Sequence, residues 1–190
     1  MRRIGISDGI TFMKSPTEKL FTTIPIFFSH GMQAKVESLS PSAHKPWAAV
    51  ESWIALGIPL SIIPPTPVTR EQLARAHDRA FIDANLDGRE LNGFNTKAAD
   101  VAASLPYTSG AMLGAARDAI RSGLVAVAPT CGFHHAGHAK AGAFCTFNGL
   151  MVTALALNAE GLSQRVGILD FDQHYGDGTE EIIQTLELTS

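Results

Sequence analysis

The chain contains the stretch Ile168-Leu169-Asp170-Phe171-Asp172-Gln173-His174-Tyr175-Gly176-Asp177-Gly178, in which an apolar run ends in acidic and histidine residues. The pattern predicts a buried strand over 166–171 that breaks into a Gly-Asp-Gly turn. Side chains at every second position of an extended segment project to the same side, so Asp170, Asp172 and His174 would point together. A catalytic zinc site has three protein ligands and one open position, and Asp172 and His174 could supply two of the three.

A second polar cluster, Gly132-Phe133-His134-His135-Ala136, lies upstream of this stretch. Adjacent imidazoles can take and return a proton during amide hydrolysis if a carboxylate holds each ring. Asp170 and Asp177 are the two spare acids close to the candidate metal ligands. The two clusters together indicate a metal-assisted hydrolase rather than a structural metal site.

Short apolar segments alternate with helical patterns along the chain. We predict strands at 24–28, 58–63, 124–128 and 166–171, and helices at 46–56, 70–84, 97–104, 107–122, 148–159 and 179–188. This alternation predicts an α/β fold with an open, mainly parallel sheet and helices on both faces. Sites in such sheets lie beyond the carboxyl ends of the strands, which is where both polar clusters fall.

The length of 190 residues and a hydrophobic content of 45% are consistent with one domain that has a sizeable core. We expect this domain over residues 21–190, preceded by an N-terminal arm over 1–20 that has no clear period. The net charge of −3, without a large basic run, argues against direct binding of nucleic acid. No apolar stretch approaches the roughly 20 residues of a membrane-spanning helix. We therefore expect a cytoplasmic protein that does not engage a membrane.

The two cysteines, Cys131 and Cys145, are too few for a disulfide framework. They lie close to the histidine pair in the sequence, so a metal or redox role is one interpretation. We favour the other interpretation, in which both are small buried thiols that pack near the site.

Three motifs resemble, in order and spacing, those of the histone deacetylase and acetylpolyamine amidohydrolase family, which has the arginase-deacetylase fold. They are Gly-Phe-His-His-Ala at 132–136, Ala-Phe-Cys-Thr-Phe-Asn at 143–148, and Asp-Phe-Asp-Gln-His-Tyr-Gly-Asp-Gly-Thr at 170–179. The resemblance implies a zinc-dependent amidohydrolase that removes acetyl or related acyl groups from lysine or polyamine amines. An arginase-type ureohydrolase is disfavoured, because its Asp-x-His-x-Asp pattern would need an acid at Gly176.

The same resemblance implies a role for each residue of the two clusters. Asp172 and His174 would bind Zn²⁺. His135 would be the principal general base and acid, and His134 its electrostatic companion. Asp170 would orient His134, and Asp177 would orient His135.

The resemblance also implies a substrate channel and a second ion. Phe144 would line one wall of a narrow channel for the acyl group. Many relatives have Gly before this residue. The methyl group of Ala143 would therefore narrow the channel or shift the loop, and either change would affect how far the substrate enters. Main-chain atoms of Asp170, Asp172 and His174 would hold K⁺ as a structural ion.

The family domain is usually much longer than this chain, and the aspartate and tyrosine that complete the site in relatives have no counterpart here. We therefore expect the N-terminal part of a deacetylase-like domain, incomplete on the C-terminal side of its sheet. An open strand edge and apolar surface would then be exposed. A second copy or a complementary C-terminal chain could cover them. The alternative function is a truncated, non-catalytic paralogue or half-domain that binds metal or a partner.

Overall fold

The computed structural model describes residues 23–35 and 40–188. The arm predicted over residues 1–20 lies outside these described residues. The described part is a mixed α/β fold with a small parallel sheet. In chain order its elements are β1 (Ile24–Phe27), η1 (His30–Met32), η2 (Pro41–Ala43), α1 (Lys45–Ala55), β2 (Leu60–Ile63), α2 (Arg70–Leu73), α3 (Arg79–Leu86), α4 (Ala99–Ser122), α5 (Gly149–Ala159) and α6 (Asp177–Thr185).

The two strands pair in parallel along their whole length. On the other side of β1, the N–H of Val127 donates to the carbonyl of Pro25 at 2.9 Å, and the N–H of Phe27 donates to the carbonyl of Val127 at 2.8 Å. β1 therefore lies between β2 and the segment around Val127. The strand predicted over 124–128 is reduced to this single parallel bridge.

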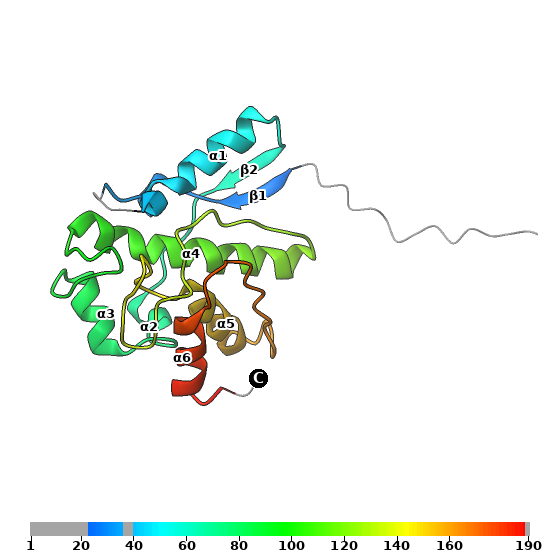
Figure 1. The fold of residues 1–190 in the computed structure, drawn as a ribbon. Helices are drawn as coiled ribbons and strands as arrows, with labels where there is room; N and C mark the ends of the chain where they lie inside the picture. The colour runs from blue at the N-terminus through cyan, green and yellow to red at the C-terminus, as the bar shows by residue number, and fades with distance from the viewer. Residues whose placement is uncertain (1–22, 36–39, 189–190) are drawn as a thin grey trace, which may run out of the picture.

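Helices lie on both sides of the strand pair (Figure 1). Val50 of α1 and Ala111 of α4 belong to one apolar cluster built around β1. Gly114 allows α4 to approach the sheet closely, because a Cβ there would lie 2.7 Å from the ring of Phe27. The predicted α/β class is confirmed, and the two described strands form a small parallel sheet.

A second apolar cluster fills the space on the far side of α4, where α2, α3, α5 and α6 gather (Figure 1). Each of these helices contributes fully buried side chains, among them Leu73, Ile82, Val152 and Ile182. α5 is almost wholly apolar, as the sequence of the helix predicted over 148–159 indicates, and it packs against α4. This cluster fixes α5 and α6, and the candidate site lies next to these two helices.

Three helix predictions are wrong in their boundaries. The helix predicted over 70–84 is broken into α2 and α3, because the side chain of Asp78 accepts from the N–H of Phe81 and starts a new helix.

The helices predicted over 97–104 and 107–122 are one helix that continues through Pro106. An interior proline costs about 3 kcal/mol, and burial of apolar side chains on both sides of Pro106 offsets that cost.

The strand predicted over 166–171 is also wrong, because no described segment pairs with it. A strand needs neighbours for its backbone N–H and C=O groups. The expected exposure of apolar surface is confirmed, since Leu169 is 85% exposed and Phe171 is 93% exposed. The missing strand and this exposure have the same cause, namely that nothing in the described chain covers the segment.

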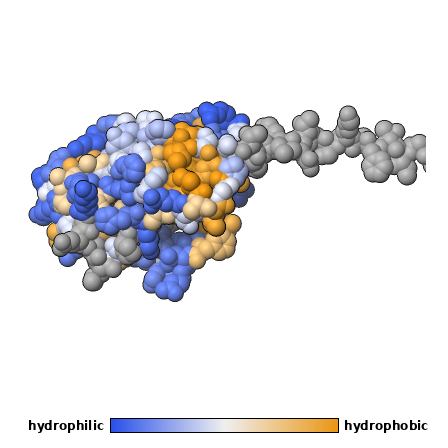
Figure 2. Space-filling model, turned by 90° about the horizontal axis from the view of Figure 1, so that it is seen from above, coloured by the Kyte–Doolittle hydropathy of each residue, from blue (hydrophilic) through white to orange (hydrophobic). Residues whose placement is uncertain are grey.

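The face that carries α1 has large apolar side chains that are less exposed than Leu169 and Phe171. Seen from the side of α1, the surface is mostly hydrophilic with one apolar patch (Figure 2). The α1–β2 region contributes exposed Ile54, Leu56 and Ile62. Among the helices of the described residues, none is both long enough and apolar enough to cross a membrane.

Candidate active site

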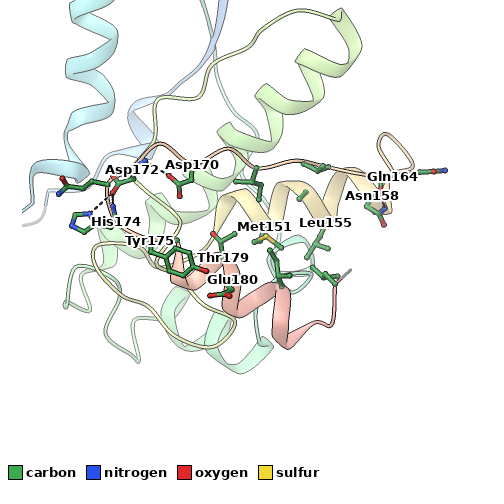
Figure 3. A pocket seen from close by; sticks show the side chains of 17 residues that line it. Met151, Leu155, Asn158, Gln164, Asp170, Asp172, His174, Tyr175, Thr179 and Glu180 are labelled. Atoms are coloured by element: carbon green, nitrogen blue, oxygen red, sulfur yellow. Dashed lines mark hydrogen bonds and ion pairs between the residues drawn. The ribbon is translucent and has the colours of Figure 1, made fainter. Parts of the chain in front are cut away.

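The segment 170–176 bends at residues 172–174 and then enters α6 (Figure 3). It contacts residues 132–138, here called the histidine loop, through the bond between Asp170 and His134. The N–H of Asp172 donates to the carboxylate of Asp170 at 3.0 Å. The N–H of His174 donates in the same way to the carboxylate of Asp172 at 2.8 Å. These local bonds fix the chain through side chains rather than through a strand ladder. The polar side chains are thus presented together even though the predicted strand is absent.

The first histidine is held by an acid 36 positions later in the chain. Nδ1 of His134 lies 2.7 Å from Oδ2 of Asp170. The His134 residue is buried, and its carbonyl accepts from the N–H of Thr179 at 3.0 Å. Hydrogen bonds from the N–H of Asp172 and from the His134 ring lower the pKa of Asp170. The carboxylate therefore stays ionised at neutral pH and can orient the ring.

The second histidine forms a matching dyad. Nδ1 of His135 lies 2.6 Å from Oδ1 of Asp177, and this bond lowers the pKa of the Asp177 carboxyl group. Because an ionised carboxylate only accepts, Nδ1 of His135 carries the proton and Nε2 is left as a base. Asp177 occupies the first turn of α6, where the helix dipole also favours negative charge. The His134 and His135 rings have centroids 4.1 Å apart.

The proposed metal ligands form a third pair beside the dyads. Nδ1 of His174 lies 3.0 Å from Oδ1 of Asp172. The N–H and the ring of His174 together lower the pKa of the Asp172 carboxyl group. The ring of His174 lies 5.9 Å, centroid to centroid, from that of His135. The structure therefore brings together the two sequence clusters that the motifs indicated.

The donor set fits part of a zinc site. One imidazole nitrogen and one carboxylate oxygen 3.0 Å apart are close to the separation of about 3.3 Å between neighbouring ligands of a tetrahedral site. Within residues 23–35 and 40–188, however, no three His, Cys, Asp or Glu side chains come together as a metal-binding group. Two candidate ligands lie side by side among the described residues, and no third side chain of these types joins them.

The loop that would form the substrate channel has a strained conformation. Ala143 and Phe144 both have positive φ, at 43° and 68°, a region that favours glycine. The turn is held by a hydrogen bond from the Phe144 N–H to the carbonyl of Gly93 at 2.9 Å. The Phe144 ring is 37% exposed and lies 6.0 Å from the ring of buried Phe94. Phe144 is thus presented at the surface by a tightly fixed turn.

The two cysteines are packing residues. Burial raises the pKa of the Cys131 and Cys145 thiols to about 11 in each case. Both are therefore protonated at neutral pH, a state that neither binds metal nor attacks an electrophile. The favoured interpretation of the sequence agrees with this environment.

The structure also contains a buried polar network next to the histidine pair, which the sequence motifs did not predict. Its centre is Asn148, which is fully buried and caps α5 by accepting from the N–H of Met151. The N–H of Asn148 donates to Nε2 of His77 at 2.8 Å. The sequence signal that could have found it is an Asn at the start of an apolar helix, which is a common N-cap.

A groove of about 990 Å³ lies next to the site, between α5, α6 and the segment 164–176 (Figure 3). Its apolar wall comes from the two helices and from Val166 and Ile168 of that segment, and its polar end is formed by Asp170, Asp172 and His174. The apolar lining includes Met151, Ala154, Leu155, Val166, Ile168 and Ile183. The candidate site therefore opens onto a largely apolar, uncovered face.

Comparisons with known proteins identify relatives of this chain. A model of the histone deacetylase domain matches residues 41–187. Histone deacetylase 15 of Arabidopsis thaliana is 30% identical over 128 residues, which are 62% of this chain and 22% of that protein. Histone deacetylase 6 of Caenorhabditis elegans is 44% identical over 62 residues, covering 33% of this chain and 6% of that protein.

Acetoin utilization protein AcuC of Staphylococcus aureus (strain COL) is 47% identical over 49 residues, covering 26% of this chain and 12% of that protein. The crystal structure of the HDA15 HD domain has the same fold, with a TM-score of 0.72 at 24% identity, over 86% of this chain and 50% of that one. The chain thus spans about half of that solved domain and less than a quarter of these curated relatives. By the match over residues 41–187, the chain belongs to the histone deacetylase domain family.

Proposed function

We propose that the chain contributes the proton-transfer residues and two zinc ligands of an amidohydrolase site that removes acetyl or related acyl groups from lysine or polyamine amines. The observation that carries this proposal is the pair of His–Asp dyads, whose rings lie 4.1 Å apart. One of the two rings lies 5.9 Å from the candidate metal ligand His174. Family membership supports the same chemistry.

The residues divide the work of amide hydrolysis as follows. A zinc ion held by Asp172 and His174 would supply a Lewis acid that polarises the amide carbonyl. Nε2 of His135 takes a proton from the attacking water and returns it to the leaving amine. Asp177 holds the His135 ring in the tautomer that leaves Nε2 free. The His134 ring, paired with its own carboxylate, stabilises the charge that develops beside it.

The substrate end of the proposal rests on the turn at Ala143 and Phe144. The exposed Phe144 ring offers one apolar wall to the acyl-bearing arm of the substrate. The positive φ of Ala143 places its methyl group where a glycine would leave space. We propose that this methyl group narrows the channel and favours short acyl groups.

Turnover needs groups that the described residues do not supply, namely a third zinc ligand and an oxyanion donor. We propose that a polypeptide equivalent to the C-terminal half of a histone deacetylase domain supplies them. Such a half would extend the small sheet into the larger open sheet of the family and cover the groove beside α5 and α6. The exposed Leu169 and Phe171 support this arrangement, as does coverage of 50% of the HDA15 HD domain.

A second candidate function is a non-catalytic half-domain that binds a metal or a partner chain. The missing third metal ligand among the described residues favours it. The large apolar groove favours it as well, because uncovered apolar surface of this kind usually marks an interaction site. This candidate keeps the fold and the partner surface but not the hydrolysis.

Zinc content and deacetylation, measured together, test the proposal. The chain is stripped with a chelator, reloaded with zinc, and assayed on a fluorogenic acetyl-lysine peptide and on an acetylated polyamine, with and without a polypeptide equivalent to the C-terminal half of a histone deacetylase domain. With that polypeptide present, we expect zinc-dependent hydrolysis that falls about 10²–10⁴-fold in His135→Ala. The control is His30→Ala, because this exposed histidine lies outside both dyads.

The outcomes separate the two candidates. A zinc-dependent rate that is insensitive to His135→Ala would exclude the proposed base. Zinc binding that is lost in Asp172→Ala but accompanied by no hydrolysis, even with the complementary polypeptide present, would support the half-domain function. A chain that under the same conditions binds no zinc and hydrolyses neither substrate would overturn the catalytic proposal.

A further inference from the structure

Asn148 connects two segments that each carry one member of the second dyad. Its side chain is fully buried. Its Nδ2 group donates to the carbonyl of Ala136 at 3.1 Å and to the hydroxyl of Thr179 at 3.0 Å. All the donors of this amide and its oxygen are thus engaged, because Oδ1 also accepts from the N–H of Met151.

The two partners of Asn148 lie next to the dyad in sequence. Ala136 directly follows His135, and Thr179 lies two residues after Asp177 in the first turn of α6. One amide therefore bridges the histidine loop and the helix that carries the carboxylate. An N-cap requires only the side-chain oxygen of Asn148. The two hydrogen bonds that its Nδ2 group donates are therefore not needed to cap α5, and they connect the loop to α6 instead.

His77 fixes Asn148 from the other side. Its Nε2 accepts from the Asn148 N–H at 2.8 Å, so Nδ1 carries the proton and donates to the carbonyl of Gly137 at 2.9 Å. The His77 ring is buried, and this burial lowers its pKa to about 4. The neutral ring thus holds both Asn148 and the end of the histidine loop.

The contact between the loop and α6 leaves little room for movement. A Cβ at Gly178 would lie 2.5 Å from the carbonyl carbons of His135 and Ala136. The N–H of Thr179 donates to the carbonyl of His134 at 3.0 Å, beside the bridge made by Asn148. Backbone touches backbone at this point, so even a small shift of α6 against the loop would change the distance between the Asp177 carboxylate and the His135 ring.

We infer that Asn148 is a positioning residue for the His135–Asp177 dyad, acting through its bridge between Ala136 and Thr179. The catalytic consequence of this inference rests on the proposed function, whereas the geometry of the dyad can be measured without turnover. The bridge acts on the backbone and touches neither a substrate nor the reacting atoms.

Proton NMR of the His135 ring tests the inference directly. A ring N–H bonded to a carboxylate resonates far downfield and exchanges slowly, and loss of the signal in His135→Ala assigns it. The variants are Asn148→Ser, which keeps a capping oxygen, and Thr179→Val, which removes only the hydroxyl partner. Thr179→Ser restores the hydroxyl, and Val152→Ala is a control for general destabilisation, because Val152 is fully buried in α5 outside the network.

We expect the ring proton to exchange at least tenfold faster in Asn148→Ser and Thr179→Val, and at the parental rate in Thr179→Ser and Val152→Ala. Exchange within twofold of the parent in both of the first two variants would overturn the inference and leave the proposed function standing. If Asn148→Ser does not fold, the comparison of Thr179→Val with Thr179→Ser tests the inference by itself. Absence of the signal from the unsubstituted chain would overturn the dyad, and with it both proposals.

Discussion

Nδ1 of His135 lies 2.6 Å from Oδ1 of Asp177, a residue 42 positions later in the chain. This bond joins the loop after Val127 to the first turn of α6 and lowers the pKa of the Asp177 carboxyl group. It is the contact on which both the proposed chemistry and part of the acid sensitivity of the fold depend.

Asp177→Asn should reduce the unfolding free energy at pH 6 by less than about 1 kcal/mol, as for an exposed ion pair. An acid whose folded pKa lies below its unfolded value adds stability above about pH 4 and loses it as the pH falls through the folded pKa. The difference between parent and variant should therefore be larger at pH 6 than at pH 3. Urea unfolding at both pH values measures it, with Glu51→Gln on the exposed surface of α1 as the control. An equal difference at the two pH values would contradict the assigned bond.

His77 should make the fold sensitive to mild acid. Its pKa falls from about 6.5 in the unfolded chain to about 4 in the fold, because burial penalises the charged ring. The unfolded chain then binds more protons between these values, so stability is present at pH 7 and is lost as the pH falls. The share due to His77 should be about 2 kcal/mol between pH 7 and pH 5.

The measurement is urea unfolding of the parent and of His77→Gln at pH 7 and pH 5. The variant should be less stable than the parent at pH 7, because Asn148 and Gly137 lose their partner. It should lack the parental loss of stability on going to pH 5. A variant with the same acid loss as the parent would place the titrating group elsewhere.

Ala143→Gly should stabilise the chain by about 1 kcal/mol. An L-residue in the left-handed region costs roughly 1–2 kcal/mol, part of which is offset by the extra unfolded-state freedom of glycine. The matched control is Ala141→Gly, two residues earlier and outside the positive-φ set, which should destabilise by about 0.5–1 kcal/mol. Thermal or urea unfolding of the two variants decides, and destabilisation by both would show that the turn is not strained at residue 143.

Substitution of Leu169 and Phe171 by Gln should leave the unfolding free energy within about 0.5 kcal/mol, because neither side chain is packed within the described chain. Self-association and binding of a hydrophobic dye should both decrease. Ile182→Ala, at a fully buried position of α6, should cost about 2–5 kcal/mol by comparison. Sedimentation velocity and urea unfolding provide the readouts. A large loss of stability in the Leu169 and Phe171 variants would mean that the segment is packed.

Local patterns determined a large part of this protein. The capping box at Thr69 and Gln72, the glycine end of α4 at Gly123 and the cap at Asn148 all occur where the sequence predicts helix boundaries. These signals depend on groups within a few residues of each other, so the sequence alone contains them. The spacing of the histidine and aspartate motifs also identified the residues that meet in the site.

The tertiary structure decided what depends on distant neighbours. The apolar run at 166–171 predicts a strand, but strand formation requires a partner that the described chain does not provide. α4 continues through Pro106 because packing on both sides outweighs the local cost. The bridge from Asn148 to Ala136 and Thr179 follows no local pattern, because it forms only when the histidine loop and α6 meet. Local hydrogen bonding can be inferred from neighbouring residues, whereas burial and long-range pairing depend on the whole fold.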